Sequence, residues 1–228
     1  MKNYKREIPL LSIHIPKCGG TSFKEVLKKW YSDNVLFHYY NEKENLMPEK
    51  FKLKKWYLNQ YKKDVCIHGH FNRKRGFGVD DYYPKIRQAI TFIRDPLEMH
   101  LSLYFFLHRK VKEGTNYRNG RKFLITNDID EFLENSSLMS LHFPKDLQKG
   151  NMVTFIDEYF VHIGVMEYYQ QSMDILAEKL KKPRIIIPHK NISKRTQVPS
   201  EEAIRRFKSK CTFEYSLYEI GLKANNII

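Results

Sequence analysis

Residues 13–23 read IHIPKCGGTSF, and they join two segments of different pattern. The apolar run 8–15 leads into this stretch, and apolar residues at helical spacing follow it over 23–30. An apolar run, a glycine-containing turn and a helical pattern in this order predict a strand, a tight turn and a helix. Gly19 and Gly20 allow a ligand to come close to the backbone of the turn, because neither residue carries a side chain.

The start of the predicted helix is suited to binding an anion. Its free backbone N–H groups and its dipole favour negative charge, and Lys17 adds a full positive charge. We expect Thr21 or Ser22 to cap the helix by accepting a hydrogen bond from a backbone N–H group. In the ATPase P-loop the lysine follows the glycines, whereas Lys17 precedes them. The turn is therefore a different phosphate site, or an ordinary strand–turn–helix corner with a solvated lysine.

The composition is that of a globular protein with an anionic partner. The chain has 228 residues, of which 42% are hydrophobic, and this predicts one domain over 1–228. Lys and Arg number 40 against 26 Asp and Glu, a net charge of +14. Such an excess attracts anions, but it does not choose between a nucleotide, a nucleic acid, a lipid and a glycan.

Cysteine usage and hydropathy narrow the class of protein further. Three widely spaced cysteines predict neither a disulfide framework nor a metal site. We expect Cys18 to fill space in the turn, the alternative being a thiol activated by the nearby positive charge. No apolar run reaches the length of about 18 residues that suggests a membrane span, and residues 1–9 lack the core of a signal peptide. We therefore expect a cytoplasmic protein with no membrane span.

Strand-like and helix-like patterns alternate along the rest of the chain. Apolar runs typical of strands lie at 64–68, 89–93, 159–165 and 184–188. Apolar residues at helical spacing lie at 48–61, 96–108, 128–134, 141–147, 167–182 and 199–210. The alternation predicts an α/β fold with a parallel sheet flanked by helices, in which ligands bind at the carboxyl ends of the strands. The least regular part of the chain lies within 111–150.

Two histidines lie at the end of the predicted strand 64–68. His68 and His70 are two residues apart, so we expect their side chains to project the same way. A neutral histidine is a candidate general base near neutral pH. The pair is alternatively the beginning of a zinc site, although no third ligand lies nearby in sequence, or a pair of structural histidines.

A second phosphate site is predicted after the strand 89–93. Arg94 follows this strand directly, and an arginine in that position can bind phosphate as a fork. Ser102 lies eight residues later, two turns into the predicted helix 96–108, and can donate a hydrogen bond from the same side. Because the turn, the histidines and Arg94 all follow predicted strands, we expect one cleft to hold them.

These motifs together resemble the membrane-linked carbohydrate sulfotransferase family that includes heparan sulfate 2-O-sulfotransferase. The resemblance extends from residue 9 to about 221, and its motifs are PKCGGTS at 16–22, HGH at 68–70, RDP with SLY within 94–104, IGVME at 163–167, the loop that starts at Asn191, and Tyr218-Glu219. It implies a P-loop-like α/β domain, the sulfotransferase fold, with 3′-phosphoadenosine 5′-phosphosulfate (PAPS) as donor.

The resemblance also implies a role for each matching residue. Lys17 would contact the 5′-phosphosulfate and its bridging oxygen, and Arg94 with Ser102 would hold the 3′-phosphate. His70 would take the proton of the acceptor hydroxyl, with His68 beside it. The rest of the turn would supply backbone and hydroxyl donors: Cys18, Gly19, Gly20, Thr21 and Ser22. A late loop would close over the nucleotide with Lys194, Arg195 and Thr196.

One position departs from the family pattern. Met99 stands where the family often carries arginine, which removes a charge near the expected 3′-phosphate site. This predicts weaker donor binding unless the neighbouring His100 compensates.

The expected function is in-line transfer of a sulfuryl group from PAPS to a hydroxyl of an acceptor, which releases 3′,5′-ADP and requires no metal. The resemblance implies a glycan acceptor, no nucleic-acid partner, a soluble bacterial-type member and an acceptor-specific excursion at roughly 111–150. Two alternatives remain. One is a nucleotide kinase of related fold, and the other is a non-catalytic protein that binds polyanions through its net charge.

Overall fold

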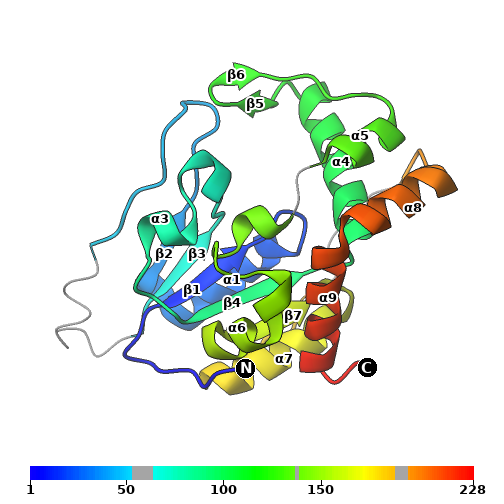
Figure 1. Ribbon diagram of the computed structural model, residues 1–228. Helices are drawn as coiled ribbons and strands as arrows, with labels where there is room; N and C mark the ends of the chain where they lie inside the picture. The colour runs from blue at the N-terminus through cyan, green and yellow to red at the C-terminus, as the bar shows by residue number, and fades with distance from the viewer. Residues whose placement is uncertain (53–63, 137–138, 188–194) are drawn as a thin grey trace.

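The computed structural model describes residues 1–52, 64–136, 139–187 and 195–228. Within these ranges, the central sheet has five strands in the order β2-β3-β1-β4-β7, and every neighbouring pair is parallel (Figure 1). The strands are β1 (Leu10–His14), β2 (Val35–His38), β3 (Cys66–Gly69), β4 (Ala89–Ile93) and β7 (Phe160–Val165). The predicted α/β fold with a parallel sheet is confirmed.

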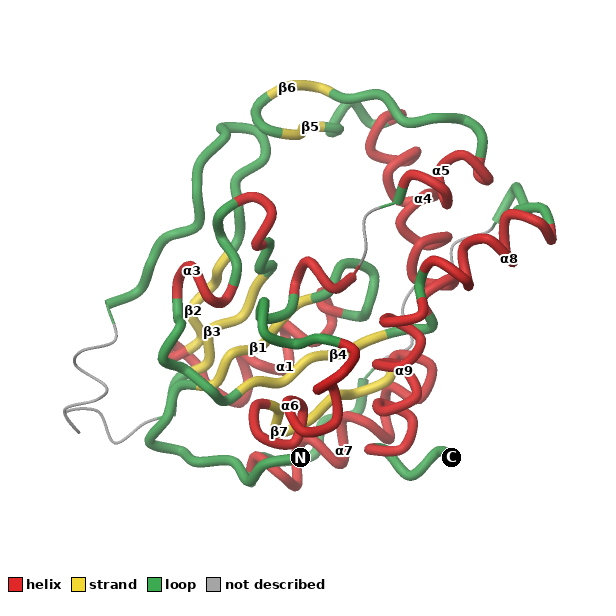
Figure 2. Tube along the Cα trace, viewed as in Figure 1, coloured by secondary structure: helices red, strands yellow, loops and turns green. Residues whose placement is uncertain are grey.

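Helices flank this sheet (Figure 2). The strands β3, β4 and β7 are buried along their whole length, and β1 is buried up to Ile13. The longer helices are α1 (Gly20–Tyr31), α4 (Pro96–Lys112), α6 (Met152–Tyr159), α7 (Tyr169–Leu180), α8 (Glu201–Lys210) and α9 (Thr212–Ala224). The shorter ones are α3 (Val79–Tyr82) and α5 (Ile129–Asn135). Burial on both faces explains why the strands read as continuous apolar runs and not as an alternating pattern.

Two predicted elements are wrong. A helix was expected at 141–147, but a 3₁₀ turn (Met139–His142) ends before Pro144, whose ring cannot continue a helix from within. A strand was expected at 184–188, but 184–187 form none. Gln170 of α7 instead holds that backbone, accepting from the Ile187 N–H group and donating to the Ile185 carbonyl.

Other elements differ in extent or were not predicted. The predicted helix 48–61 falls largely on 53–63, outside the described residues. The strand expected at 64–68 instead runs from Cys66 to Gly69. The short strand β2, the helix α6 and a hairpin of β5 (Tyr117–Arg118) and β6 (Arg121–Lys122) were not predicted.

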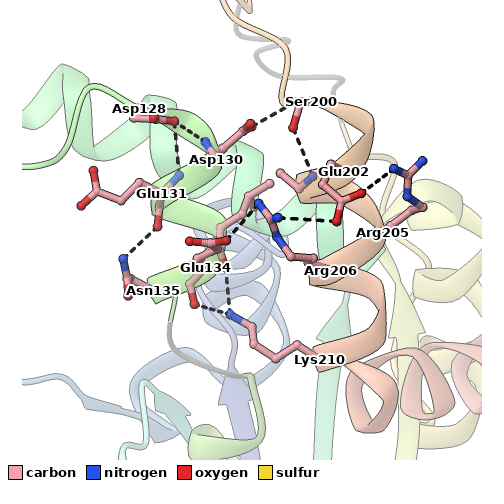
Figure 3. A network of polar contacts seen from close by, with 12 residues as sticks. Asp128, Asp130, Glu131, Glu134, Asn135, Ser200, Glu202, Arg205, Arg206 and Lys210 are labelled. Carbon is pink, nitrogen blue, oxygen red and sulfur yellow. Dashed lines mark hydrogen bonds and ion pairs between the residues drawn. The ribbon is translucent and has the colours of Figure 1, made fainter.

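The helices α4, α5 and α8 form a second, smaller core beside the sheet. Its buried members are Leu101, Tyr104, Ile129, Leu133, Phe207 and Cys211. A polar network fastens α5 to α8 (Figure 3). Asp130 accepts from the backbone N–H of Ser200, which caps α8, and Arg206 lies 3.0 Å from Glu134. Lys210 donates to the carbonyls of Leu133 and Glu134 at the end of α5.

The bonds of Lys210 are expected to stabilise this second core. Replacing Lys210 with Met removes the donor to the Glu134 carbonyl and one of the two donors to the Leu133 carbonyl, the other being the Ser136 hydroxyl. We expect the free energy of unfolding to fall by about 1 kcal/mol. Urea denaturation measures this loss. Lys208→Met is the matched control, because Lys208 is exposed on the same helix and should change stability by less than about 0.5 kcal/mol. Equal stability of the two variants would contradict the assignment.

Candidate functional site

A cavity of about 440 Å³ opens at the carboxyl ends of the central strands. It is lined by residues from the turn after β1, the residue after β3, the end of β4, the inner face of α4 and the end of β7. These residues are His14, Pro16, Lys17, Gly19, Gly20, Thr21, Ser22, His70, Arg94, Ser102, Phe106, Arg109 and Met166. The structure thus brings the glycine turn, one of the two predicted histidines, Arg94 and Ser102 to one cavity.

The glycine turn leaves the first N–H groups of α1 without a side-chain cap. The N-cap residue is Gly19, which has a left-handed backbone (φ 77°), and no side chain accepts a hydrogen bond there. A Cβ on Gly19 would lie 2.7 Å from the sulfur of Met166, so a glycine is required. Thr21 and Ser22 lie inside the first turn of α1, so the predicted cap is wrong. The uncapped N–H groups are available to an anion.

Three cationic side chains meet at the cavity: Lys17, Arg94 and Arg109. Burial, together with the two arginines, lowers the pKa of Lys17. The Lys17 ammonium lies 4.3 Å from the centre of the Phe106 ring, and in the described ranges it has no carboxylate partner. Because no carboxylate balances the charge of Lys17, a bound anion would stabilise this group of three cations.

Arg109 was not predicted as a site residue. Ser102, Phe106 and Arg109 lie on one face of α4, at spacings of four and three residues. The predicted helix ended at 108, four residues before the end of α4, which hid this spacing. His100, suggested as a compensating charge for Met99, is instead fully buried and bonded to the Pro96 carbonyl. Arg109 is the additional cation on α4 that lines the cavity.

Arg94 is held by two carboxylates. Its guanidinium lies 3.4 Å from Glu98 and 3.7 Å from Glu167. Burial raises the pKa of Glu167. Glu98 also accepts from Arg195, and this hydrogen bond lowers the pKa of Glu98. The carboxylate of Glu98 therefore bridges Arg195 and Arg94.

The other two residues of the late loop are placed differently. Lys194 lies outside the described residues. Thr196 does not line the cavity with Lys17 but a neighbouring one of about 450 Å³, which also includes Tyr104, His108 and Arg109. The two cavities adjoin at Arg109.

The two predicted histidines are not equivalent. The strand β3 continues to Gly69, so His68 lies within the sheet, fully buried, with its Nδ1 2.9 Å from the hydroxyl of Ser12. His70 follows the strand and lines the cavity. The ring of His14, from β1, is stacked between them, at 5.2 Å from His68 and 4.2 Å from His70. The expectation that both histidines face the cleft is wrong for His68.

The hydrogen bond of His70 fixes its tautomer. Its Nδ1 lies 2.7 Å from the backbone carbonyl of His14. Because a carbonyl only accepts, Nδ1 carries the proton, and Nε2 of the neutral ring keeps a free lone pair. Burial lowers the pKa of His70, so the ring is neutral at pH 7. Nε2 of His70 is therefore able to accept a proton.

Burial distinguishes the two interpretations of Cys18. Cys18 is 1% exposed, and burial raises the pKa of its thiol, so Cys18 fills space in the turn. Among the described residues, no group of three or more His, Cys, Asp or Glu side chains is arranged to hold a metal ion. No helix within the same residues has the length and hydropathy to cross a bilayer.

Comparison with known proteins gives a match among solved structures alone. No protein-family model matches the chain, and no curated protein matches its sequence. Among solved structures, the chain is similar to the mouse sulfotransferase SULT7A1, whose crystal structure is a complex with PAP. The TM-score is 0.48 at 13% sequence identity, and the match covers 92% of this chain and 67% of that one.

Proposed function

We propose that this chain is a PAPS-dependent sulfotransferase that transfers a sulfuryl group to a hydroxyl of an acceptor. One observation carries the proposal: Lys17 with the start of α1, Arg94 with Ser102, and the neutral ring of His70 line the same cavity. Two cationic sites suit the two ends of a donor that carries phosphate at both the 3′ and the 5′ position. A neutral imidazole beside them suits the proton of a hydroxyl nucleophile.

The donor fits the cavity by charge. In this proposal, Lys17 and the uncapped N–H groups at Gly20, Thr21 and Ser22 bind the 5′-phosphosulfate. Arg94 and Ser102 bind the 3′-phosphate, and Arg195 is linked to Arg94 through Glu98. Arg109 is the further cation of the cavity, and it supplies the charge that Met99 lacks. Each of these groups is a donor of hydrogen bonds or a cation, as a polyanionic nucleotide requires.

The proposed reaction is an in-line displacement. Nε2 of His70 takes the proton of the acceptor hydroxyl as the oxygen attacks sulfur, and Lys17 stabilises the charge that develops on the leaving phosphate oxygen. Catalysis then depends mainly on position and charge, because the protein supplies no covalent step. His68 contributes from within the sheet by packing beside His14.

We further propose a glycan as the acceptor, within a single domain over 1–228. The net charge of +14 and the resemblance of the motifs support this choice. In the excursion at 111–150, the β5–β6 hairpin exposes Arg118, Arg121 and Lys122. Arg75 links its turn to the rest of the chain, bonding to both Glu42 and Asn119. A fixed cationic hairpin suits an acceptor that carries negative charge.

Transfer from labelled PAPS to a panel of hydroxyl acceptors tests this function. The panel contains simple alcohols, phenols, neutral oligosaccharides and acidic oligosaccharides. We expect acceptor-dependent release of 3′,5′-ADP, greatest with the oligosaccharides. Phosphoryl transfer from ATP without any use of PAPS would establish the kinase instead. Binding of every polyanion with a steep dependence on salt, and no nucleotide binding, would establish the non-catalytic alternative.

Arg94 is expected to select for the 3′-phosphate. In the Arg94→Ala variant we expect the Kd for 3′,5′-ADP to rise about 10- to 100-fold, since hydrogen bonds to charged groups contribute about 1.5–3 kcal/mol. The Kd for 5′-AMP, which lacks that phosphate, should change little. Calorimetry measures both constants. Arg87→Ala is the control, because Arg87 is exposed and precedes β4 at the end of the strand away from the cavity. This variant loses the same charge and should leave both constants unchanged. Equal weakening of both nucleotides in Arg94→Ala would contradict the assignment.

A further inference from the structure

The side chain of His14 is part of the site, although none of the matched motifs includes it. His14 is the last residue of β1, and its ring lines the cavity. The rings of His14 and His70 are nearly parallel, with 22° between their planes and 4.2 Å between their centres. This stack follows from the parallel pairing of β1 with β3, in which Ser12 lies opposite His68 and Ile13 opposite Gly69. His14 is therefore a fixed neighbour of the proposed base.

The hydrogen bonding of His14 leaves one ring nitrogen for a ligand. Its Nδ1 lies 3.0 Å from the hydroxyl of Tyr39. Burial, and then the neighbouring His70 and His68, lower the pKa of His14 well below its usual value, so the ring is neutral and carries one proton. A phenol is a stronger acid than the N–H of a neutral imidazole, and this favours the tautomer in which the Tyr39 hydroxyl donates to Nδ1. The proton of the His14 ring is then on Nε2.

Nε2 of His14 lies at the start of α1. A Cβ built on Gly20, the first residue of that helix, would be only 1.7 Å from this nitrogen. The ring thus fills the space that any side chain at position 20 would need. Within the described residues Nε2 has no hydrogen-bond partner, and it borders the cavity where the uncapped N–H groups of α1 also lie. A free N–H donor in that position adds to an anion site.

We infer that Nε2–H of His14 donates a hydrogen bond to an oxygen of the sulfuryl group during transfer, an inference that rests on the proposed function. The attacking oxygen and the sulfur must approach to about 3–3.5 Å before reaction. The centres of the His14 and His70 rings are 4.2 Å apart, so the two rings can contact neighbouring groups. His14 would contact the sulfuryl group, and His70 the acceptor hydroxyl. His14 is then a second catalytic histidine, and it keeps its proton throughout.

The step balances without a further reactant. The bond from sulfur to the leaving phosphate oxygen breaks, and a bond from sulfur to the acceptor oxygen forms. The hydroxyl proton goes to Nε2 of His70, and Lys17 meets the charge of the leaving phosphate. The equatorial sulfuryl oxygens receive the hydrogen bond of His14, which strengthens as charge shifts in the transition state.

Two variants of His14 test the inference. His14→Phe keeps an aromatic ring for the stack but removes both nitrogens, and we expect kcat to fall about 10²- to 10³-fold. The Kd for 3′,5′-ADP should stay within twofold of the wild type, because that product has no sulfuryl group. His14→Gln places an amide N–H near the position of Nε2. We expect its kcat to be at least tenfold higher than that of His14→Phe. Tyr39→Phe removes the partner of Nδ1 and should lower kcat by about 5- to 10-fold.

The outcomes separate this inference from the proposed function. Wild-type kcat in His14→Phe would overturn the inference while leaving the sulfotransferase intact. A parallel loss of kcat and of 3′,5′-ADP binding would also overturn it, because it would show that the ring only shapes the turn. If the His14→Phe protein does not fold, a kcat of His14→Gln no higher than that of His14→Ala contradicts the role of the N–H donor. Failure of the wild type to use PAPS would instead reject the proposed function.

Discussion

Replacement of His70 by alanine is expected to lower kcat by about 10²- to 10⁴-fold, the usual effect of removing a general base. His70→Asn sharpens the experiment. Its amide N–H can replace the Nδ1–H donor to the His14 carbonyl, but it has no basic nitrogen at the position of Nε2. We expect the same loss of kcat in both variants, with 3′,5′-ADP binding and thermal stability retained in His70→Asn. Steady-state rates with saturating PAPS measure the effect.

His142→Asn is the matched control for His70. The ring of His142 lies 6.3 Å from that of His70, and its Nδ1 bonds to the Phe71 carbonyl in the same manner. His142 does not line the cavity with Lys17, so we expect kcat to fall by less than about tenfold. If kcat fell as far in His142→Asn as in His70→Asn, the rate would depend on the packing of these histidines and not on a base at His70.

The same assignment predicts the pH dependence of the rate. Burial lowers the pKa of His70 from its ordinary 6.5. A base acts in its neutral form, so kcat/KM should be constant through neutral pH and fall only as pH drops through a midpoint below 6.5. A midpoint above 6.5 would contradict a buried base. Loss of this acidic limb in His70→Asn would assign it to that ring.

Replacement of Lys17 by alanine is the second large effect. We expect kcat to fall about 10²- to 10³-fold, because a charge that stabilises the leaving group acts mainly in the transition state. Binding of 3′,5′-ADP should weaken less than kcat falls. The partial burial of the Lys17 ammonium against Phe106 should make this charge more effective than one in water.

Lys24→Ala is the control for Lys17. Lys24 lies on α1, five residues after Gly19, and its ammonium rests over the Phe37 ring, 4.3 Å from its centre, without lining the cavity. We expect kcat within about threefold of the wild type, because Lys24 does not line the cavity. Activity above one tenth of the wild type in Lys17→Ala would remove the lysine from the mechanism and, with it, the interpretation of the glycine turn.

Local patterns were sufficient for most elements that position the site. The apolar runs of β1, β4 and β7 and the spacing in α4 are visible because each is a continuous pattern in a single segment. The hairpin after 116 also has a local signal, since Asn119-Gly120 is a turn sequence typical of hairpins. The helix α6 carries buried residues at helical spacing and was missed in the same way.

Contacts between distant segments were beyond the reach of local patterns. His14 reads as part of an apolar run, and only the register of β1 against β3 places its ring between His68 and His70. The strand β3 extends one residue past its expected end, to Gly69, so His68 stays within the sheet and His70 reaches the cavity. Arg109 was missed because it lies just beyond the predicted helix 96–108. The ends of helices are the least reliable part of a prediction from sequence.

Thermal unfolding of the wild type with 3′,5′-ADP or with 5′-AMP tests the central claim most directly, namely that one cavity binds both ends of a bisphosphorylated nucleotide. At 100 times its Kd, a ligand adds about 2.7 kcal/mol to the stability of the folded state. The account predicts a clear rise in Tm with 3′,5′-ADP and, at the same concentration, little or none with 5′-AMP. Equal shifts with the two nucleotides, or no shift with either, would contradict it.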